Sequence, residues 1–130
     1  LKFNPYCVDL SGGLETDGIK DFDKIAIIVP TKALIYQYKS RISNFLKNKE
    51  NILTGIDAYN NSMKKYICIL TQERLKAFID RNIEFNIAFI DEAHNLLEDD
   101  ERAHKLAECI SKLKRQNNSI IFKFFYSVFK

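Results

Sequence analysis

The chain has 130 residues, of which 46% are hydrophobic and 28% are charged, with only four glycines and two prolines. This balance is typical of one folded globular domain and excludes a disordered or low-complexity chain. No apolar run approaches the roughly 20 residues that a membrane-spanning helix needs, so we expect no membrane partner. The net charge of +3 permits a nucleic-acid partner without indicating one.

The cysteines do not form a recognisable metal-binding or disulfide pattern. Cys7, Cys68 and Cys109 are odd in number and far apart, with no Cys-x-x-Cys pair and only two histidines in the chain. Neither a disulfide framework nor a zinc site follows from this spacing. We expect reduced, partly buried thiols in a cytoplasmic protein.

Residues 1–23 show no periodicity and hold three of the four glycines, so we expect an irregular N-terminal segment there and a folded domain over residues 24–130. Residues 24–29 form an apolar, β-branched run, which predicts a strand buried on both faces. Pro30 ends that strand, because proline cannot donate a hydrogen bond to a sheet. Thr31 is a suitable N-cap for a helix that runs to about residue 47. Four side chains at helical spacing are predicted to face the core: Leu34, Tyr38, Ile42 and Phe45.

The next elements repeat this alternation. A short extended piece over residues 51–54 and a polar loop precede a second buried strand, residues 66–70. Thr71 is a suitable cap for the helix that follows. Its predicted core side chains are Leu75, Phe78 and Ile79.

A third buried strand is predicted over residues 86–90 and a fourth over residues 119–125. Between them, an amphipathic helix begins within residues 98–102. Its predicted core side chains are Leu106, Ile110 and Leu113.

Strands that alternate with helices predict an α/β fold, a mostly parallel sheet with helices on both faces. In such sheets ligands bind beyond the carboxyl ends of the strands. The first three predicted strands each end in polar residues, so their chemistry is expected at one common edge. The three segments are Pro30-Thr31-Lys32, Thr71-Gln72-Glu73-Arg74 and Asp91-Glu92-Ala93-His94.

Asp91 and Glu92 follow the third strand without a spacer. We expect both carboxylates to lie outside the core, since burying unpaired charges is too costly. One carboxylate at a strand end can hold a hard cation such as Mg²⁺, and its neighbour can activate a water aimed at a phosphate. An acidic cap of the next helix is the alternative interpretation of an isolated Asp-Glu pair.

Three segments in this order resemble the motifs of superfamily-two DEAD/DEAH-box helicases. Ile90-Asp-Glu-Ala-His94 resembles the DEAH box, motif II, which follows a hydrophobic strand. Ile28-Val-Pro-Thr-Lys-Ala-Leu34 resembles motif Ia, and Leu70-Thr-Gln-Glu-Arg-Leu75 resembles motif Ib. Each stands at the end of a predicted strand and ahead of a helix. The resemblance covers about residues 24–126.

The resemblance implies a fold, cofactors and residue roles. The fold is a truncated RecA-like P-loop NTPase domain, and the cofactors of the complete enzyme are ATP and Mg²⁺. Asp91 would coordinate Mg²⁺ through the nucleotide, Glu92 would activate the attacking water, and His94 would link the nucleotide site to a second domain. The contacts to the sugar-phosphate backbone of one DNA or RNA strand would come from Pro30, Thr31, Lys32, Thr71, Gln72 and Arg74. Hydroxyls, cations and helix-start amides suit such contacts, which do not read bases.

The sequence departs from the family where the triphosphate should be held. Family members carry a loop of the Gly-x-Gly-Lys-Ser/Thr type ahead of motif Ia. Residues 5–20 stand in that place and contain no Gly-Lys-Ser or Gly-Lys-Thr sequence. The second RecA-like domain of a complete helicase does not fit into 130 residues. We therefore expect a fragment that lacks the P-loop and is not active alone.

Two other hypotheses remain open. The chain could be a non-catalytic module, derived from a helicase domain, that binds nucleic acid or protein. It could also be a different α/β binding domain without a P-loop, in which DEAH occurs by chance. A Gly-Lys-Thr loop encoded just upstream, or a Gln-x-x-Gly-Arg-x-x-Arg motif downstream, would favour a fragment of an active enzyme.

Overall fold

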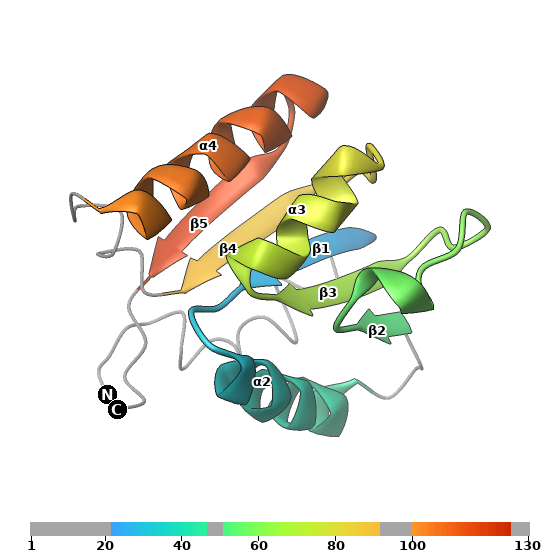
Figure 1. Ribbon diagram of the computed structural model, residues 1–130. Helices are drawn as coiled ribbons and strands as arrows, with labels where there is room; N and C mark the ends of the chain where they lie inside the picture. Colours follow the sequence, from blue (N-terminus) through green and yellow to red (C-terminus); the bar gives the residue numbers. More distant parts are fainter. Residues whose placement is uncertain (1–21, 47–50, 92–99, 126–130) are drawn as a thin grey trace.

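The computed structural model describes residues 22–46, 51–91 and 100–125. Within these residues the chain forms one sheet of five parallel strands in the order β2-β3-β1-β4-β5, with helices on both faces (Figure 1). This confirms the predicted α/β fold. The elements are β1 (Lys24–Ile28), α2 (Lys32–Phe45), β2 (Asn51–Leu53), the 3-10 turn η3 (Ile56–Ala58), β3 (Tyr66–Leu70), α3 (Gln72–Asp80), β4 (Ile87–Asp91), α4 (Glu101–Gln116) and β5 (Ile121–Phe125).

β1 lies at the centre of the sheet and pairs with β3 on one side and β4 on the other. Lys24 is opposite Tyr66 and Ile28 is opposite Leu70 in the first pair. In the second pair Ile28 is opposite Ile90. The three strands therefore end at the same level, because parallel strands in register bring their carboxyl ends to one edge.

The face of the sheet that α2 covers is built from alternate residues of the three central strands. β1 contributes Ile25 and Ile27, and α2 contributes Ile35 and Ile42. All four side chains are at most 1% exposed. The predicted helix is confirmed, but Ile35 rather than Leu34 is the buried residue of its first turn, and Leu34 is half-buried. The side chain of Phe45 lies outside the described residues.

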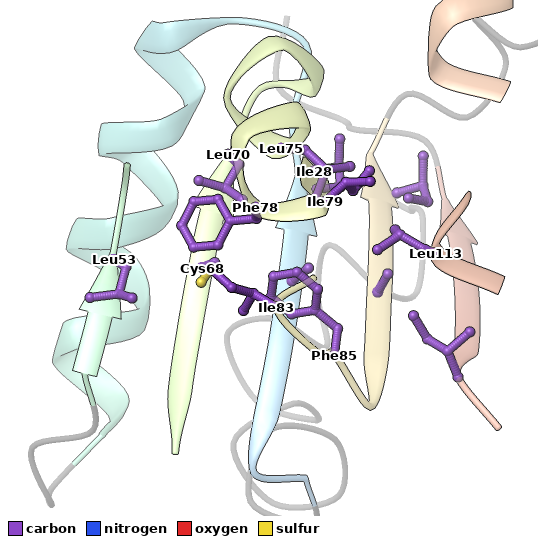
Figure 2. Packing of buried hydrophobic residues seen from close by; sticks show 14 of the residues in the cluster. Ile28, Leu53, Cys68, Leu70, Leu75, Phe78, Ile79, Ile83, Phe85 and Leu113 are labelled. Carbon is purple, nitrogen blue, oxygen red and sulfur yellow. The ribbon is translucent and has the colours of Figure 1, made fainter. Parts of the chain in front are cut away.

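The opposite face packs against α3 and α4. Figure 2 shows Leu75, Phe78 and Ile79 of α3 directed at the sheet residues Ile28 and Leu70. The predicted core residues of α3 are all buried. In α4, Leu106 and Leu113 are buried and Ile110 is half-buried against the same core. These side chains are the main apolar contacts that hold both helices on the sheet.

Two further elements agree with the sequence prediction and add detail to it. The extended piece at residues 51–54 is a strand of the sheet, β2, which pairs with β3 through Asn51, Ile52 and Leu53. The helix expected to begin within residues 98–102 begins at Glu101, because the Asp100 side chain accepts a hydrogen bond from the backbone N–H of Ala103 at 2.8 Å. Three residues are too few to show an alternating pattern, so the sequence predicted an extended piece there but not its pairing with β3.

The described cysteines are free thiols. Cys68 lies in β3 and is fully buried, and burial raises its pKa far above the usual value. Cys109 in α4 is half-buried, and partial burial also raises its pKa. Both thiols are thus held protonated, as small apolar groups of the core. Cys7 lies outside the described residues. Among the described helices, none is long and apolar enough to cross a membrane.

The core contact of α3 gives a first prediction. Phe78 is 0% exposed and packs edge to face with Tyr59, with ring centroids 6.3 Å apart. Phe78→Ala should lower the free energy of unfolding by about 3–5 kcal/mol, because it removes a buried ring and leaves a cavity. Urea unfolding followed by circular dichroism measures this change. Tyr36→Ala is the control, since Tyr36 is 55% exposed on α2, and it should shift the value by no more than about 0.5 kcal/mol. Equal losses in the two variants would contradict this packing.

Candidate functional site

The carboxyl ends of β1, β3 and β4 form one edge of the sheet, and the β1–α2 and β3–α3 turns begin there (Figure 1). The pairing of β1 and β3 extends past the strands, since the backbone N–H of Val29 donates to the Leu70 carbonyl at 2.9 Å. The predicted common edge is confirmed. Thr31, Thr71 and Asp91 each stand at a strand end on this edge.

On the β1 side of the edge, Thr31 caps α2. Its hydroxyl oxygen accepts a hydrogen bond from the backbone N–H of Leu34 at 3.3 Å. Thr31 and Lys32 are exposed, and Pro30 is half-buried. The first backbone N–H groups of α2 point to this edge, where a helix start carries a partial positive charge. The exposed hydroxyl, the lysine and these amides are groups that can contact an anion.

On the β3 side, the side chains are more deeply packed. Thr71 is 5% exposed, and its hydroxyl oxygen accepts from the backbone N–H of Arg74 at 3.4 Å. Gln72 is also 5% exposed, and its Nε2 donates to the backbone carbonyl of Arg102 at 2.9 Å. Arg74 is half-buried and donates from Nη1 to the Thr54 carbonyl at 2.9 Å. Gln72 thus links the start of α3 to the start of α4, and Arg74 links the start of α3 to the chain just after β2.

The expectation that Asp91 lies outside the core is wrong. Asp91 is the last residue of β4 and is 4% exposed. Strand alternation turns it to the face that α2 covers, where the Tyr38 hydroxyl donates to its Oδ2 at 2.7 Å. This hydrogen bond gives one oxygen of the buried carboxyl group a partner, which offsets part of the cost of its burial. Glu92 and His94 lie outside the described residues.

Arg102, in the first turn of α4, connects the two sides of the edge. Its Nε and Nη2 donate to the two carboxylate oxygens of Glu73, both at 3.1 Å. Its Nη2 also donates to the Pro30 carbonyl at 3.1 Å. Partial burial acts to raise the pKa of Glu73, but hydrogen bonds and the charge of Arg102 outweigh it, so this pKa lies below its usual value. The pair is therefore ionised at neutral pH.

Sequence reasoning missed the roles of two side chains at this edge. Tyr38 was predicted as core from its helical spacing, and it is 2% exposed, but its hydroxyl also holds Asp91. A tyrosine at a core position can signal such a bond, because a buried hydroxyl needs a partner. Arg102 has no comparable signal, since an arginine in the first turn of a helix is usually a solvated charge.

Comparison with known proteins gives one short match and one long match. A stretch of 24 residues is 71% identical to part of an N-(5'-phosphoribosyl)anthranilate isomerase of Endomicrobium trichonymphae, covering 18% of this chain and 12% of that protein. A segment this short is less than a folding unit and does not carry a fold or an activity. The model of the DEAD/DEAH box helicase family matches residues 14–124, which is most of the chain and includes β1 to β4 and all of β5 except its last residue. The chain therefore belongs to the DEAD/DEAH box helicase family.

Proposed function

We propose that this chain is part of the first RecA-like domain of an ATP-dependent DEAH-box helicase or translocase. In this proposal residues 24–130 form the partial ATP-binding domain. The polar segments at Thr31 and Thr71 bind one nucleic-acid strand through its sugar-phosphate backbone. The DEAH box, which begins at Asp91, forms part of the ATP-binding site. ATP turnover then requires a phosphate-binding loop and a second helicase domain from the complete protein.

The observation that carries this proposal is the single edge shared by the three motif segments. Because β1 lies between β3 and β4, the segments at Thr31, Thr71 and Asp91 are neighbours in space. The family match covers all three segments, which supports assigning this edge a role in a helicase. Two helix starts, an exposed lysine and a threonine hydroxyl suit phosphate contacts without base reading. Binding that tolerates any sequence and weakens with salt is the expected behaviour.

Asp91 is of the right type to hold Mg²⁺ together with a nucleotide. Magnesium is commonly held by one or two carboxylates together with water and the phosphates of the substrate. No cluster of three or more metal-ligating side chains occurs in the part of the chain that the structure describes. A carboxylate at a strand end suits a cation shared with a nucleotide, because Mg²⁺ then takes its other ligands from phosphate oxygens and water. When bound, the cation would neutralise phosphate charge, and Tyr38 would keep the carboxylate oriented.

A non-catalytic nucleic-acid-binding module is the second candidate function. The observation in its favour is that the 130 residues contain no Gly-Lys-Ser or Gly-Lys-Thr sequence. Such a module would bind nucleic acid through the edge at Thr31 and Thr71 and would not bind a nucleotide. Both functions predict nucleic-acid binding by this chain, and they differ in whether the complete protein hydrolyses ATP.

Nucleic-acid binding can be tested at Lys32, which is exposed beside the cap of α2. Lys32→Ala should weaken binding of a fluorescein-labelled single-stranded oligonucleotide by about threefold to tenfold, or about 0.7–1.4 kcal/mol. Loss of one phosphate contact should also reduce the slope of log K against log salt by about 0.7. Fluorescence anisotropy at several salt concentrations, with DNA and with RNA, measures both quantities.

Lys64→Ala is the matched control for this test. Lys64 is exposed and stands just before β3, at the opposite edge of the sheet, so its removal changes the net charge equally. Affinity should change by less than about twofold. Arg74→Ala in the Lys32→Ala background should weaken binding further, provided that its stability is unchanged. If Lys32→Ala and Lys64→Ala behave alike, the assignment of this edge fails.

The chain alone should show no ATP turnover above background. Its sequence has no Gly-Lys-Ser or Gly-Lys-Thr loop to hold the triphosphate, and helicases of this family hydrolyse ATP between two domains. Phosphate release in the presence of ATP and Mg²⁺ measures this. Turnover that Glu92→Gln abolishes would contradict the prediction and show that the chain holds a complete site.

The hydrogen bond between Tyr38 and Asp91 gives a stability prediction. Tyr38→Phe should lower the free energy of unfolding by about 1–3 kcal/mol, because a buried carboxylate loses a donor while the packing of the ring is kept. Tyr36→Phe is the control on the same helix, since Tyr36 is exposed, and it should change stability by less than about 0.5 kcal/mol. Urea unfolding compares the two. Equal free energies of unfolding for the two variants would show that the hydrogen bond from Tyr38 to Asp91 does not stabilise the fold.

A further inference from the structure

We propose that Arg102 is a positioning residue, which fixes the spacing between the two helix starts that contact the nucleic-acid strand. This inference rests on the proposed function of the edge. Arg102 belongs to α4, outside the three motif segments, and its contacts reach two of them. In this role it sets the geometry of the contacts without itself touching a phosphate.

The first contact holds the β1–α2 turn. Arg102 Nη2 donates to the Pro30 carbonyl at 3.1 Å, and Pro30 directly precedes Thr31, the cap of α2. Proline has a fixed φ, so a hydrogen bond to its carbonyl leaves the turn little freedom to rotate. The position of the α2 start is therefore tied to the start of α4.

The second contact holds the start of α3. Arg102 makes a two-point ion pair with Glu73, which lies in the first turn of α3. Thr71, the cap of that helix, also hydrogen-bonds Glu73 and helps to lower its pKa. The Gln72 side chain donates to the backbone carbonyl of Arg102, a further bond between the same two turns. A guanidinium in this two-point geometry fixes orientation as well as distance.

Stability alone does not account for this arrangement. The side chains of Arg102 and Glu73 are 43% and 62% exposed, and ion pairs at such exposure add little to folding. Lys105–Glu101 and Lys112–Glu108, by comparison, join residues within α4 only. The Arg102 pair instead joins α4 to α3, and its third bond reaches the β1–α2 turn. Because Arg102 contacts both the β1–α2 turn and the start of α3, it can set the distance between them.

The charge of Glu73 makes the proposal testable against simple electrostatics. A carboxylate near a bound polyanion is repulsive, so its removal should strengthen binding if only charge matters. If Glu73 instead holds Arg102 and the start of α3 in place, its removal should weaken binding. Glu73→Gln therefore separates the two explanations by the sign of its effect.

The experiment uses the full chain and the single-stranded oligonucleotide probe described above, with anisotropy titrations at several salt concentrations. Arg102→Ala, Arg102→Lys and Glu73→Gln should each weaken binding by about threefold to tenfold. Arg102→Lys keeps the charge but not the planar, two-point geometry, so it should not restore the affinity of the unaltered chain. The salt slope should stay that of the unaltered chain, in contrast to Lys32→Ala, where it falls by about 0.7.

Lys105→Ala is the matched control, because Lys105 carries the same charge in the same part of α4 and its ion pair with Glu101 stays within that helix. It should change affinity by less than about twofold. Urea unfolding of every variant checks that the fold persists. A salt slope that falls in Arg102→Ala would mean that Arg102 itself binds a phosphate, which overturns the proposal.

A second readout does not need nucleic acid. The backbone N–H groups of Leu34 and Arg74 donate to the hydroxyls of Thr31 and Thr71, so their hydrogen exchange reports on the two helix starts. Arg102→Ala should speed exchange at both amides by about threefold or more, with global stability unchanged, and Lys105→Ala should not.

The two readouts separate failure of this inference from failure of the proposed function. If the unaltered chain binds and Lys32→Ala weakens it while Arg102→Ala does not, the positioning role is wrong and the proposed function stands. If the unaltered chain does not bind, the proposed function fails. The positioning role then fails with it. Where the unaltered chain does bind, unchanged exchange at both amides in Arg102→Ala overturns the positioning role.

Discussion

The parallel pairing of β1 with a neighbour on each side determines where the side chains of the candidate site lie. Because Ile28 is opposite both Leu70 and Ile90, three strand ends that are distant in sequence lie at one level of the sheet. A shift of one residue in either pairing would turn the apolar residues of a strand to the wrong face. Since both faces are covered by helices, the two buried clusters fix this register, and the register fixes the edge.

Much of this arrangement could be predicted from the sequence, because buried parallel strands are continuous apolar runs with clear ends. Residues 66–70 are an example, since the predicted strand and β3 coincide. Thr71 was predicted as a helix cap for a local reason, its hydroxyl, and the cap is present. These signals lie within a few neighbouring residues, and so a single sequence is enough to recognise them.

The missed features depend on contacts between distant residues. Asp91 was expected outside the core because the sequence could not show the hydroxyl of Tyr38, 53 residues away in the chain, that donates to it on the face covered by α2. The burial of Ile35 in place of Leu34 reflects how α2 is rotated on the strands, which spacing alone leaves undetermined. The contacts of Arg102 join three separate elements. Tyr38 fixes the body of α2 to the end of β4, and Arg102 fixes the residue before the N-cap of α2 from the other face of the sheet.

The central position of β1 also has a consequence for how the chain is made. Every strand pair among the described residues is parallel, so none can form as a local hairpin, and the backbone of Lys24 bonds Asn86, 62 residues further along. Contacts of such sequence separation slow folding. On the ribosome, β1 emerges before β3 and β4. It therefore cannot form its sheet hydrogen bonds until both of these strands have been synthesised. The strand at the centre of the finished sheet is therefore the one whose two neighbours are both made after it.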